Sequence, residues 1–154
     1  MDDDPGESTQ QRRNRQLIEL LNELRLAVPG VQMLFGFLLA VPFTTRFSSA
    51  SRLDRNLYLV ALLSAAAATL CLIAPTAIHR IEWQHGQKQQ LLQLSNHLAI
   101  IGTVFLAVAI STAIGFITDF LLGGAWAALI AGVSALLFAA LWYAVPLIRL
   151  WRTS

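Results

Sequence analysis

The stretch "LYLVALLSAAAATLCLIAPTAI", Leu57 to Ile78, contains no charged residue. A helix that crosses the hydrocarbon core of a bilayer needs about 20 consecutive, mostly apolar residues. The stretch is long enough, and the composition agrees with it, because 56% of the chain is hydrophobic and only 13% is charged. Soluble domains carry about 25% charged residues. The stretch therefore predicts a transmembrane helix in a membrane protein.

Three further apolar stretches flank this helix, one before it and two after it. The last two are separated only by Gly123 and Gly124, so we expect them to be antiparallel neighbours. Small residues four positions apart, such as Ala61 and Ala65, favour close contacts between helices in lipid. The sequence predicts an all-α, integral membrane four-helix bundle. The spans are expected at about 27–43, 57–78, 98–122 and 125–148, within a membrane domain of residues 27–150.

The segment before the first span divides into two parts. Residues 1–7 are acidic, contain Pro and Gly and lack an apolar anchor, so we expect a disordered N-terminus. Residues 8–26 carry leucines at helical spacing, which predicts an amphipathic helix. Three positions for this helix stay open: along the cytosolic membrane surface, against the cytosolic ends of its own bundle, or on a partner. Pro29-Gly30 then predicts a break where the chain turns into the bilayer.

Positive charge is distributed unevenly between the two sides of the predicted bundle. Eight Lys or Arg residues fall on the side of the termini and the middle loop, and three, Arg46, Arg52 and Arg55, fall on the other side. Because cytoplasmic segments carry the excess of Lys and Arg, the bias places both termini in the cytoplasm of a bacterial plasma (inner) membrane. Tyr58 and Trp126 are expected in the aromatic belt at the outer interface.

The sequence carries no catalytic signature, so we expect neither an enzyme nor a cofactor nor a metal centre. His79, His85 and His97 have spacings that match no familiar zinc-ligand pattern. Cys71 is the only cysteine, and the basic residues form no dense patch that would indicate a nucleic-acid partner. Asp119 is the one carboxylate in the predicted spans, at the far end of the third, beside the Gly-Gly turn.

Six positions are candidates for a functional or structural polar role: Glu23, Arg25, Gln32, Pro75, His79 and Arg80. The Gln32 amide is the costliest group within a span, because it needs a partner in lipid. Pro75 removes a backbone hydrogen bond and predicts a kink near the end of the second span. His79 and Arg80 fall at the inner headgroup level, as interfacial anchors or as a functional cluster. We expect Glu23 and Arg25 to meet Arg80 or the cytosolic stem near the inner interface, because both ends lie at the same depth. Glu23 should then lie within about 10 Å of Arg80, the Debye length at 0.1 M salt.

Three segments resemble a family of small bacterial four-span membrane proteins of unknown function. They are "ELRLAVPGVQMLFGFLLAVPF" (23–43), "LYLVALLSAAAATLCLIAPTAIHR" (57–80) and "LSNHLAIIGTVFLAVAIS" (94–111). The shared elements are a Glu-Leu-Arg lead-in, a Gly-Val-Gln start and Pro-Phe end of the first span, and Ile-Ala-Pro followed by His-Arg at the end of the second. The resemblance covers roughly residues 16–150. It implies a four-helix protein of the plasma membrane and assigns no activity.

Two functional hypotheses follow. The first is a small non-enzymatic accessory or interaction protein, with the lipid bilayer around it and either a membrane-protein partner or a second copy of the chain beside it. The alternative is an oligomeric small transporter or channel, in which Gln32 and the hydroxyl groups of the spans line a path. Proton-coupled exporters keep a titratable carboxylate within a span. The first span carries Gln32 instead, which favours the first hypothesis.

Overall fold

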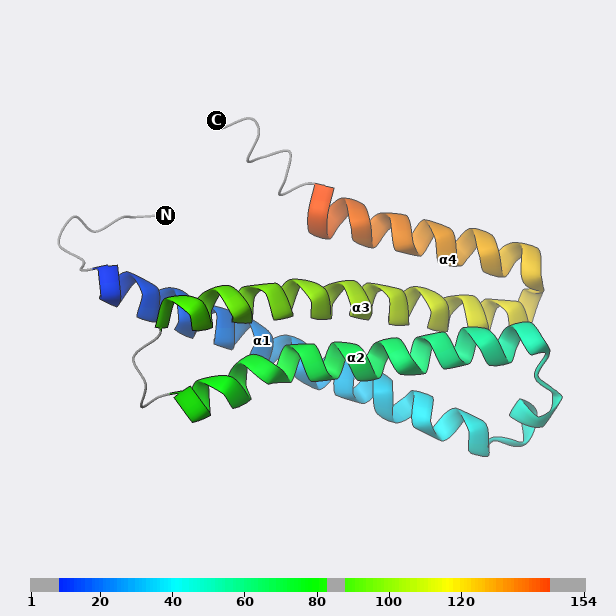
Figure 1. The fold of residues 1–154 in the computed structure, drawn as a ribbon. Coiled ribbons are helices and arrows are strands. Elements are labelled where there is room, and N and C mark those ends of the chain that lie inside the picture. The colour runs from blue at the N-terminus through cyan, green and yellow to red at the C-terminus, as the bar shows by residue number, and fades with distance from the viewer. Residues whose placement is uncertain (1–8, 83–87, 145–154) are drawn as a thin grey trace.

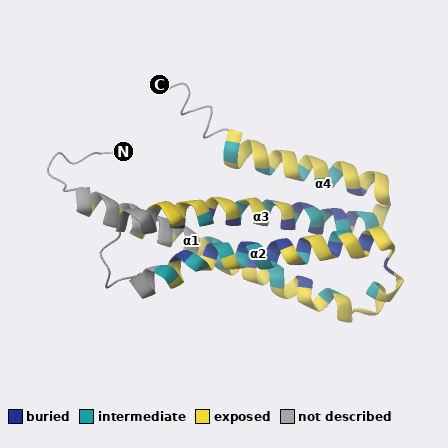
Figure 2. Ribbon diagram, in the orientation of Figure 1, coloured by how far each residue is buried: buried dark blue, intermediate teal, exposed yellow. Residues whose placement is uncertain are grey.

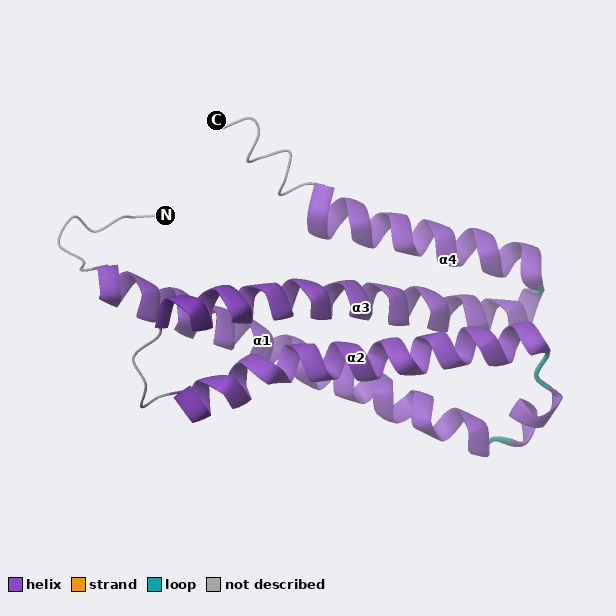
Figure 3. Cartoon of the chain, in the orientation of Figure 1, coloured by secondary structure: helices purple, strands orange, loops and turns teal. Residues whose placement is uncertain are grey.

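The computed structural model describes residues 9–82 and 88–144, and these residues form four long helices (Figure 1). Every described residue is helical except Thr44, Ala50, Ser51 and Gly123, which belong to the short connections (Figure 3). Predictions for residues 1–7, for the middle loop with His85 and for the chain beyond residue 144 lie outside this description. Four segments are long and apolar enough to cross a membrane: Arg25–Phe43, Arg52–Ile78, Gln93–Leu122 and Gly124–Ala144. The predicted all-α bundle with four apolar helices is confirmed.

The first helix differs from the expectation. α1 runs from Thr9 to Ala40 as one continuous helix, which joins the predicted amphipathic segment to the first span. The break predicted at Pro29-Gly30 is wrong, because the helix passes through both residues. Both are exposed. The proline removes only one intrahelical hydrogen bond, and membrane helices accommodate such a loss by small local adjustments. Two short 3-10 turns, η1 (Val41–Phe43) and η2 (Thr45–Ser49), then lead to α2.

The next two helices form the centre of the bundle. α2 spans Arg52–Glu82 and α3 spans Lys88–Leu122, so both extend beyond their predicted spans toward the middle loop. Two contacts define their antiparallel register. The Tyr58 and Phe116 rings have centroids 6.2 Å apart, and Gly102 lies directly against the Leu72 side chain. Fourteen residues separate these contacts along each helix, so the register is constant between them.

The interface between α2 and α3 repeats with the period of a coiled coil. Its positions recur every three and four residues, as in a heptad. Most are small, which lets the two backbones approach closely. On α2 they are Asp54, Tyr58, Ala61, Ala65, Ala68, Leu72 and Pro75, and on α3 they are Ser95, Ala99, Gly102, Leu106, Ala109, Ala113 and Phe116. This pattern makes α2 and α3 the best-packed pair of the molecule.

The fourth helix lies at the edge of the bundle. α4 (Gly124–Ala139) continues into a π-helical turn, η3 (Ala140–Ala144). It folds back on α3 through Gly123, whose φ of 95° favours glycine, and the predicted antiparallel arrangement is confirmed. Figure 2 shows α4 exposed over most of its length, whereas buried residues line α2 and α3. The α1–α2 connection and the α3–α4 turn lie at one end, which we call the loop end, and the opposite end is called the stem end (Figure 1).

Candidate functional site at the loop end

The six sequence candidates do not converge on a described site. Gln32 and Arg25 are exposed on α1, and Pro75 is fully buried within α2. Glu23, His79 and Arg80 belong to α1 and α2, but their side chains lie outside the described part of the structure. The expected proximity of Glu23 to Arg80 therefore stays a prediction. Gln32, the residue assigned to a transport path, faces outward from the bundle.

Three threonine hydroxyl groups of the spans are satisfied by their own helices, whereas the buried hydroxyl groups of Ser95 and Ser111 have no hydrogen-bond partner among the described residues. Thr69 Oγ1 donates to the carbonyl of Ala65 at 2.8 Å, and Thr112 Oγ1 donates to that of Val108 at 2.7 Å. Thr103 Oγ1 donates to the carbonyl of Ile100 and also lies 2.8 Å from the Tyr143 hydroxyl of η3. Such local bonds let hydroxyl groups sit in lipid at little cost. The Thr103–Tyr143 contact is a polar link between the third and fourth helices.

A buried carboxyl begins α2. The Ser51 N–H donates to Asp54 Oδ2 at 2.9 Å, and the Asp54 N–H donates to Ser51 Oγ at 3.0 Å. This reciprocal pair is a capping box, which satisfies N–H groups that a helix N-terminus leaves without partners. The cap starts α2 at Arg52 rather than at the Leu57 expected from hydropathy, and it draws Asp54 into the bundle. Asp54 is only 6% exposed.

A second carboxyl approaches from α3. Asp119 lies one turn before the end of this helix and is half-buried, and its carboxyl neighbours that of Asp54. Asp54 Oδ1 is buried and has no N–H or O–H partner among the described groups. The turn into α4 also passes close by, since a Cβ added to Gly124 would lie 3.3 Å from Asp119 Oδ1. Three helices therefore meet at two carboxyl groups.

An aromatic cluster lies one turn further into the bundle. Phe47 of η2 packs edge-on against Tyr58 with ring centroids 5.1 Å apart, and Phe116 lies 6.5 Å from Phe47. Tyr58 is buried in this cluster. The sequence placed it in the aromatic belt at the outer interface, and in the structure its ring is covered by Phe47 of the α1–α2 connection. The cluster fixes η2 against the central pair.

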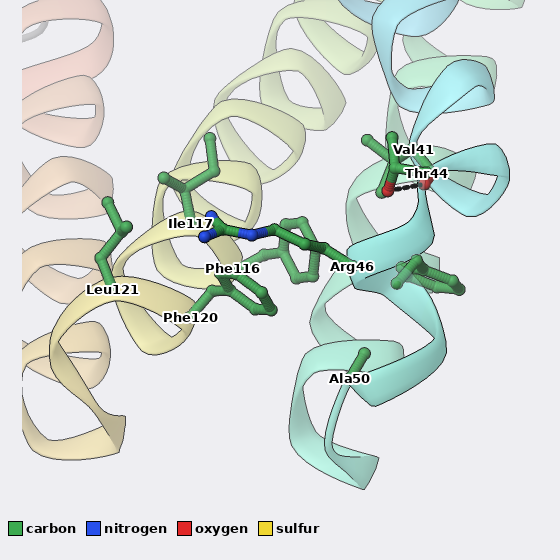
Figure 4. A pocket seen from close by; sticks show the side chains of 9 residues that line it. Val41, Thr44, Arg46, Ala50, Phe116, Ile117, Phe120 and Leu121 are labelled. Atoms are coloured by element: carbon green, nitrogen blue, oxygen red, sulfur yellow. Dashed lines mark hydrogen bonds between the residues drawn. The ribbon is translucent and has the colours of Figure 1, made fainter.

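A pocket of about 210 Å³ opens beside this cluster, and its walls are almost entirely apolar (Figure 4). Arg46 reaches from η2 toward α3, and its guanidinium carbon lies 5.7 Å from the centroid of the Phe120 ring. This distance is within the range of a cation–π contact. The lining residues are Val41, Thr44, Arg46, Phe47, Ala50, Phe116, Ile117, Phe120 and Leu121. The loop end thus combines an apolar pocket, the Arg46 guanidinium over the Phe120 ring and two neighbouring carboxyl groups.

Comparison with known proteins identifies the family and goes no further. A family model described as "Family of unknown function (DUF6328)" matches residues 6–146. The chain belongs to this family. No curated protein and no solved structure matches the chain. Membership of DUF6328 over most of the chain, together with the four apolar helices, agrees with the resemblance noted in the sequence to four-span proteins without an assigned activity.

In this DUF6328 member, the sequence and the structure draw attention to opposite ends of the bundle. The sequence candidates come mainly from the stem end, whereas the described carboxyl groups meet at the loop end. One signal was present in the sequence. Ser51 and Asp54 have the spacing of a capping box, which would have moved the start of the second helix to Arg52 and included Asp54 in it. Asp119 was noticed, but without its partner.

Proposed function

We propose that this protein is a non-enzymatic accessory subunit of the bacterial inner membrane, which binds another membrane protein through α4 and keeps both termini in the cytoplasm. The orientation rests on the excess of Lys and Arg at the termini and in the middle loop. It is consistent with α1 beginning and η3 ending at the same end of the bundle (Figure 1). The three arginines of the opposite side lie at the loop end, which then faces the periplasm.

The position of α4 supports this proposal most directly. Among the described helices its backbone approaches α3 alone, apart from Gly124, which lies beside Leu53 of α2. Ala127 is the only buried residue described within it. In lipid, helices associate where small residues allow close approach. One outward face of α4 is made of small exposed residues at spacings of three and four: Gly124, Ala128, Gly132, Ala135 and Ala139. A transmembrane helix of the partner fits against this face.

The observations give less support to the transporter alternative. Gln32 lies on the exposed side of α1, and Thr69 and Thr112 donate to carbonyl groups of their own helices. Most positions of the contact between α2 and α3 are small, and they form no continuous row of polar groups. An observation at the helix cap supports a non-enzymatic role. There the Ser51 hydroxyl oxygen accepts a hydrogen bond from the Asp54 N–H. It is therefore poorly suited to act as an activated nucleophile.

The test is to extract the tagged full-length chain from its native membrane in polymer-bounded discs and measure what accompanies it. The expected result is one membrane protein at a fixed stoichiometry. Gly132→Leu adds bulk to the small-residue face of α4 and should abolish this association. Gly36→Leu is the matched control, because Gly36 is also exposed with nothing within 4 Å of an added Cβ, but on α1. It should retain the partner.

Two other results contradict the proposal. A stable self-oligomer without a partner would show that α4 binds a second copy, and ion flux through the purified protein in liposomes would establish the transporter alternative.

The orientation has a separate test, in which a reporter active only in the periplasm is fused after Ser154. The reporter should be silent, and activity there would reverse the topology.

A further inference from the structure

We propose that Asp54 and Asp119 form a binding site for one proton, which the two carboxyl groups share at the loop end of the native protein at neutral pH. The inference concerns the chemistry of the bundle itself and does not depend on the accessory function or on α4 binding a partner. Acidic residues within a membrane-spanning segment are rare because a charge there is costly, and they usually mark a functional site.

The unpartnered oxygen of Asp54 is the observation that calls for a ligand. Its Oδ2 accepts the Ser51 N–H, but its Oδ1 is buried without a donor. A buried acceptor without a partner is costly. The carboxyl that neighbours this oxygen from another helix is that of Asp119, which the α2–α3 register brings beside Asp54. Two ionised carboxylates are both acceptors, so they form a hydrogen bond only when one of them carries a proton. One shared proton therefore completes the site.

No cation among the described residues replaces this proton. The charged or titratable groups on the elements that meet at this end are Arg46 of η2 and Arg52, Arg55 and Tyr58 of α2, while the described part of α4 has none near its start. The three arginines are exposed, and within residues 9–82 and 88–144 neither carboxyl forms an ion pair with them. Arg46 is instead directed to the Phe120 ring. The two carboxyl groups thus face each other without a positive neighbour.

A metal ion fits this site less well than a proton. Calcium takes six to eight oxygen ligands, and magnesium requires a nearly ideal octahedron. The described residues contain no group of three or more His, Cys, Asp or Glu side chains that could hold a metal ion. Asp54 has one oxygen already engaged at the helix cap. A proton needs only one oxygen from each residue, which is what the pair offers.

The proton would hold three helices together. Asp54 is at the first turn of α2, Asp119 is at the last turn of α3, and Gly124 begins α4 beside the Asp119 carboxyl. With the proton bound, a hydrogen bond joins α2 to α3 at this end. Without it, two like charges lie in contact at a partly buried position, which is destabilising. Loss of the proton should therefore loosen the loop end first.

The experiment measures the thermal unfolding midpoint of the full-length protein, in one detergent at constant ionic strength, between pH 5 and 9. The unfolded chain has both aspartates ionised across this range, whereas the native state holds one more proton, so stability should decrease as pH rises. One proton corresponds to at most about 3–5 °C per pH unit for a protein of this size. Asp119→Asn should remove this dependence, because its amide donates to Asp54 at every pH. Glu19→Gln, an exposed site on α1, should retain it.

Infrared spectroscopy gives a direct and independent measurement. With isotope-labelled aspartate, the native protein at pH 7 should show the carbonyl band of one protonated carboxylic acid, which disappears in Asp119→Asn and in Asp54→Asn. The proposal is wrong if that band is absent at pH 7, or if the wild type and Asp119→Asn have parallel pH profiles. A midpoint that rises with added Na⁺ or Ca²⁺ in the wild type, but not in Asp119→Asn, would also overturn it in favour of a cation site.

Discussion

The α2–α3 pair and the α3–α4 pair are both antiparallel and keep a constant register, yet they differ in how much they bury. Between α3 and α4, Gly115 lies near Ala131 and Thr103 contacts Tyr143, and twelve residues separate these contacts along each side of the pair. The register is therefore as regular as that between α2 and α3. The extent of burial differs between the pairs. In the membrane-spanning part of α2, 33% is buried within the protein, whereas the value for the fourth span is 6%.

The difference teaches what holds helices together in this protein. Lipid tails are as apolar as leucine, so hydrophobicity does not drive helices to associate within the bilayer. Close packing and hydrogen bonds do. The α2–α3 contact runs over seven positions of each helix, and most of these positions are small. By contrast, α4 has one buried residue, and a hydrogen bond from η3 links its end to α3. The central pair should therefore determine stability, and α4 should be separable from it.

The largest effect should come from filling the closest contact of the central pair. A Cβ at Gly102 would lie 2.8 Å from the Cγ and Cδ2 of Leu72 and 3.2 Å from the Cβ of Cys71. Gly102→Val should therefore destabilise the protein by about 3 kcal/mol, the upper end of the usual cost of overpacking. The measurement is equilibrium unfolding in mixed detergent micelles, followed by intrinsic tryptophan fluorescence.

A second substitution distinguishes this clash from a general loss of helix propensity. Leu72→Ala in the Gly102→Val background removes the atoms that the valine meets, so it should recover part of the lost stability even though Leu72→Ala alone is destabilising. If the double variant is no more stable than Gly102→Val, α2 and α3 are not in contact at this position and their antiparallel register is different from the one described above.

A smaller effect is expected at the polar link to α4. Tyr143→Phe removes the hydroxyl that contacts Thr103 Oγ1, while Thr103 keeps its bond to the Ile100 carbonyl. Hydrogen bonds between membrane helices average about 0.6 kcal/mol and reach about 1.7 kcal/mol. We expect a loss in this range, with increased hydrogen exchange confined to α4 and η3. Increased exchange throughout α2 would contradict the idea that α4 is separable.

The spans could be predicted because the thickness of the bilayer sets their length and because lipid tails form no hydrogen bonds with backbone N–H and C=O groups. Any stretch that crosses it must be apolar, helical and about 20 residues long, and this requirement can be read from one sequence. The antiparallel turn at Gly123 was also predictable, since a two-residue connection leaves no other arrangement for the helices on either side. These features depend on local sequence alone.

The carboxyl pair and the course of α1 were not predictable in the same way. Asp54 and Asp119 are 65 positions apart, and only the register between α2 and α3 brings them together. The proline rule failed at Pro29 because a long membrane helix can accommodate one proline by small local adjustments, as α2 also does at the buried Pro75. Tyr58 was assigned to the interface because its depth was clear, but the segment that covers it, η2, has no hydropathy signal.

The smallest effect should come from a glycine that neither pair uses. Gly132 is exposed on α4, and a Cβ there would meet nothing within 4 Å. Gly132→Ala should leave stability unchanged or raise it by at most about 1 kcal/mol, the helix propensity gained on replacing glycine with alanine. The same unfolding assay with Gly102→Ala, where the added Cβ is too close to Leu72, should give a loss instead. Equal effects at the two glycines would mean that helix propensity, and not the packing of the central pair, governs stability. A loss at Gly132 in detergent, where only copies of this chain are present, would mean that its face of α4 already contacts a second copy.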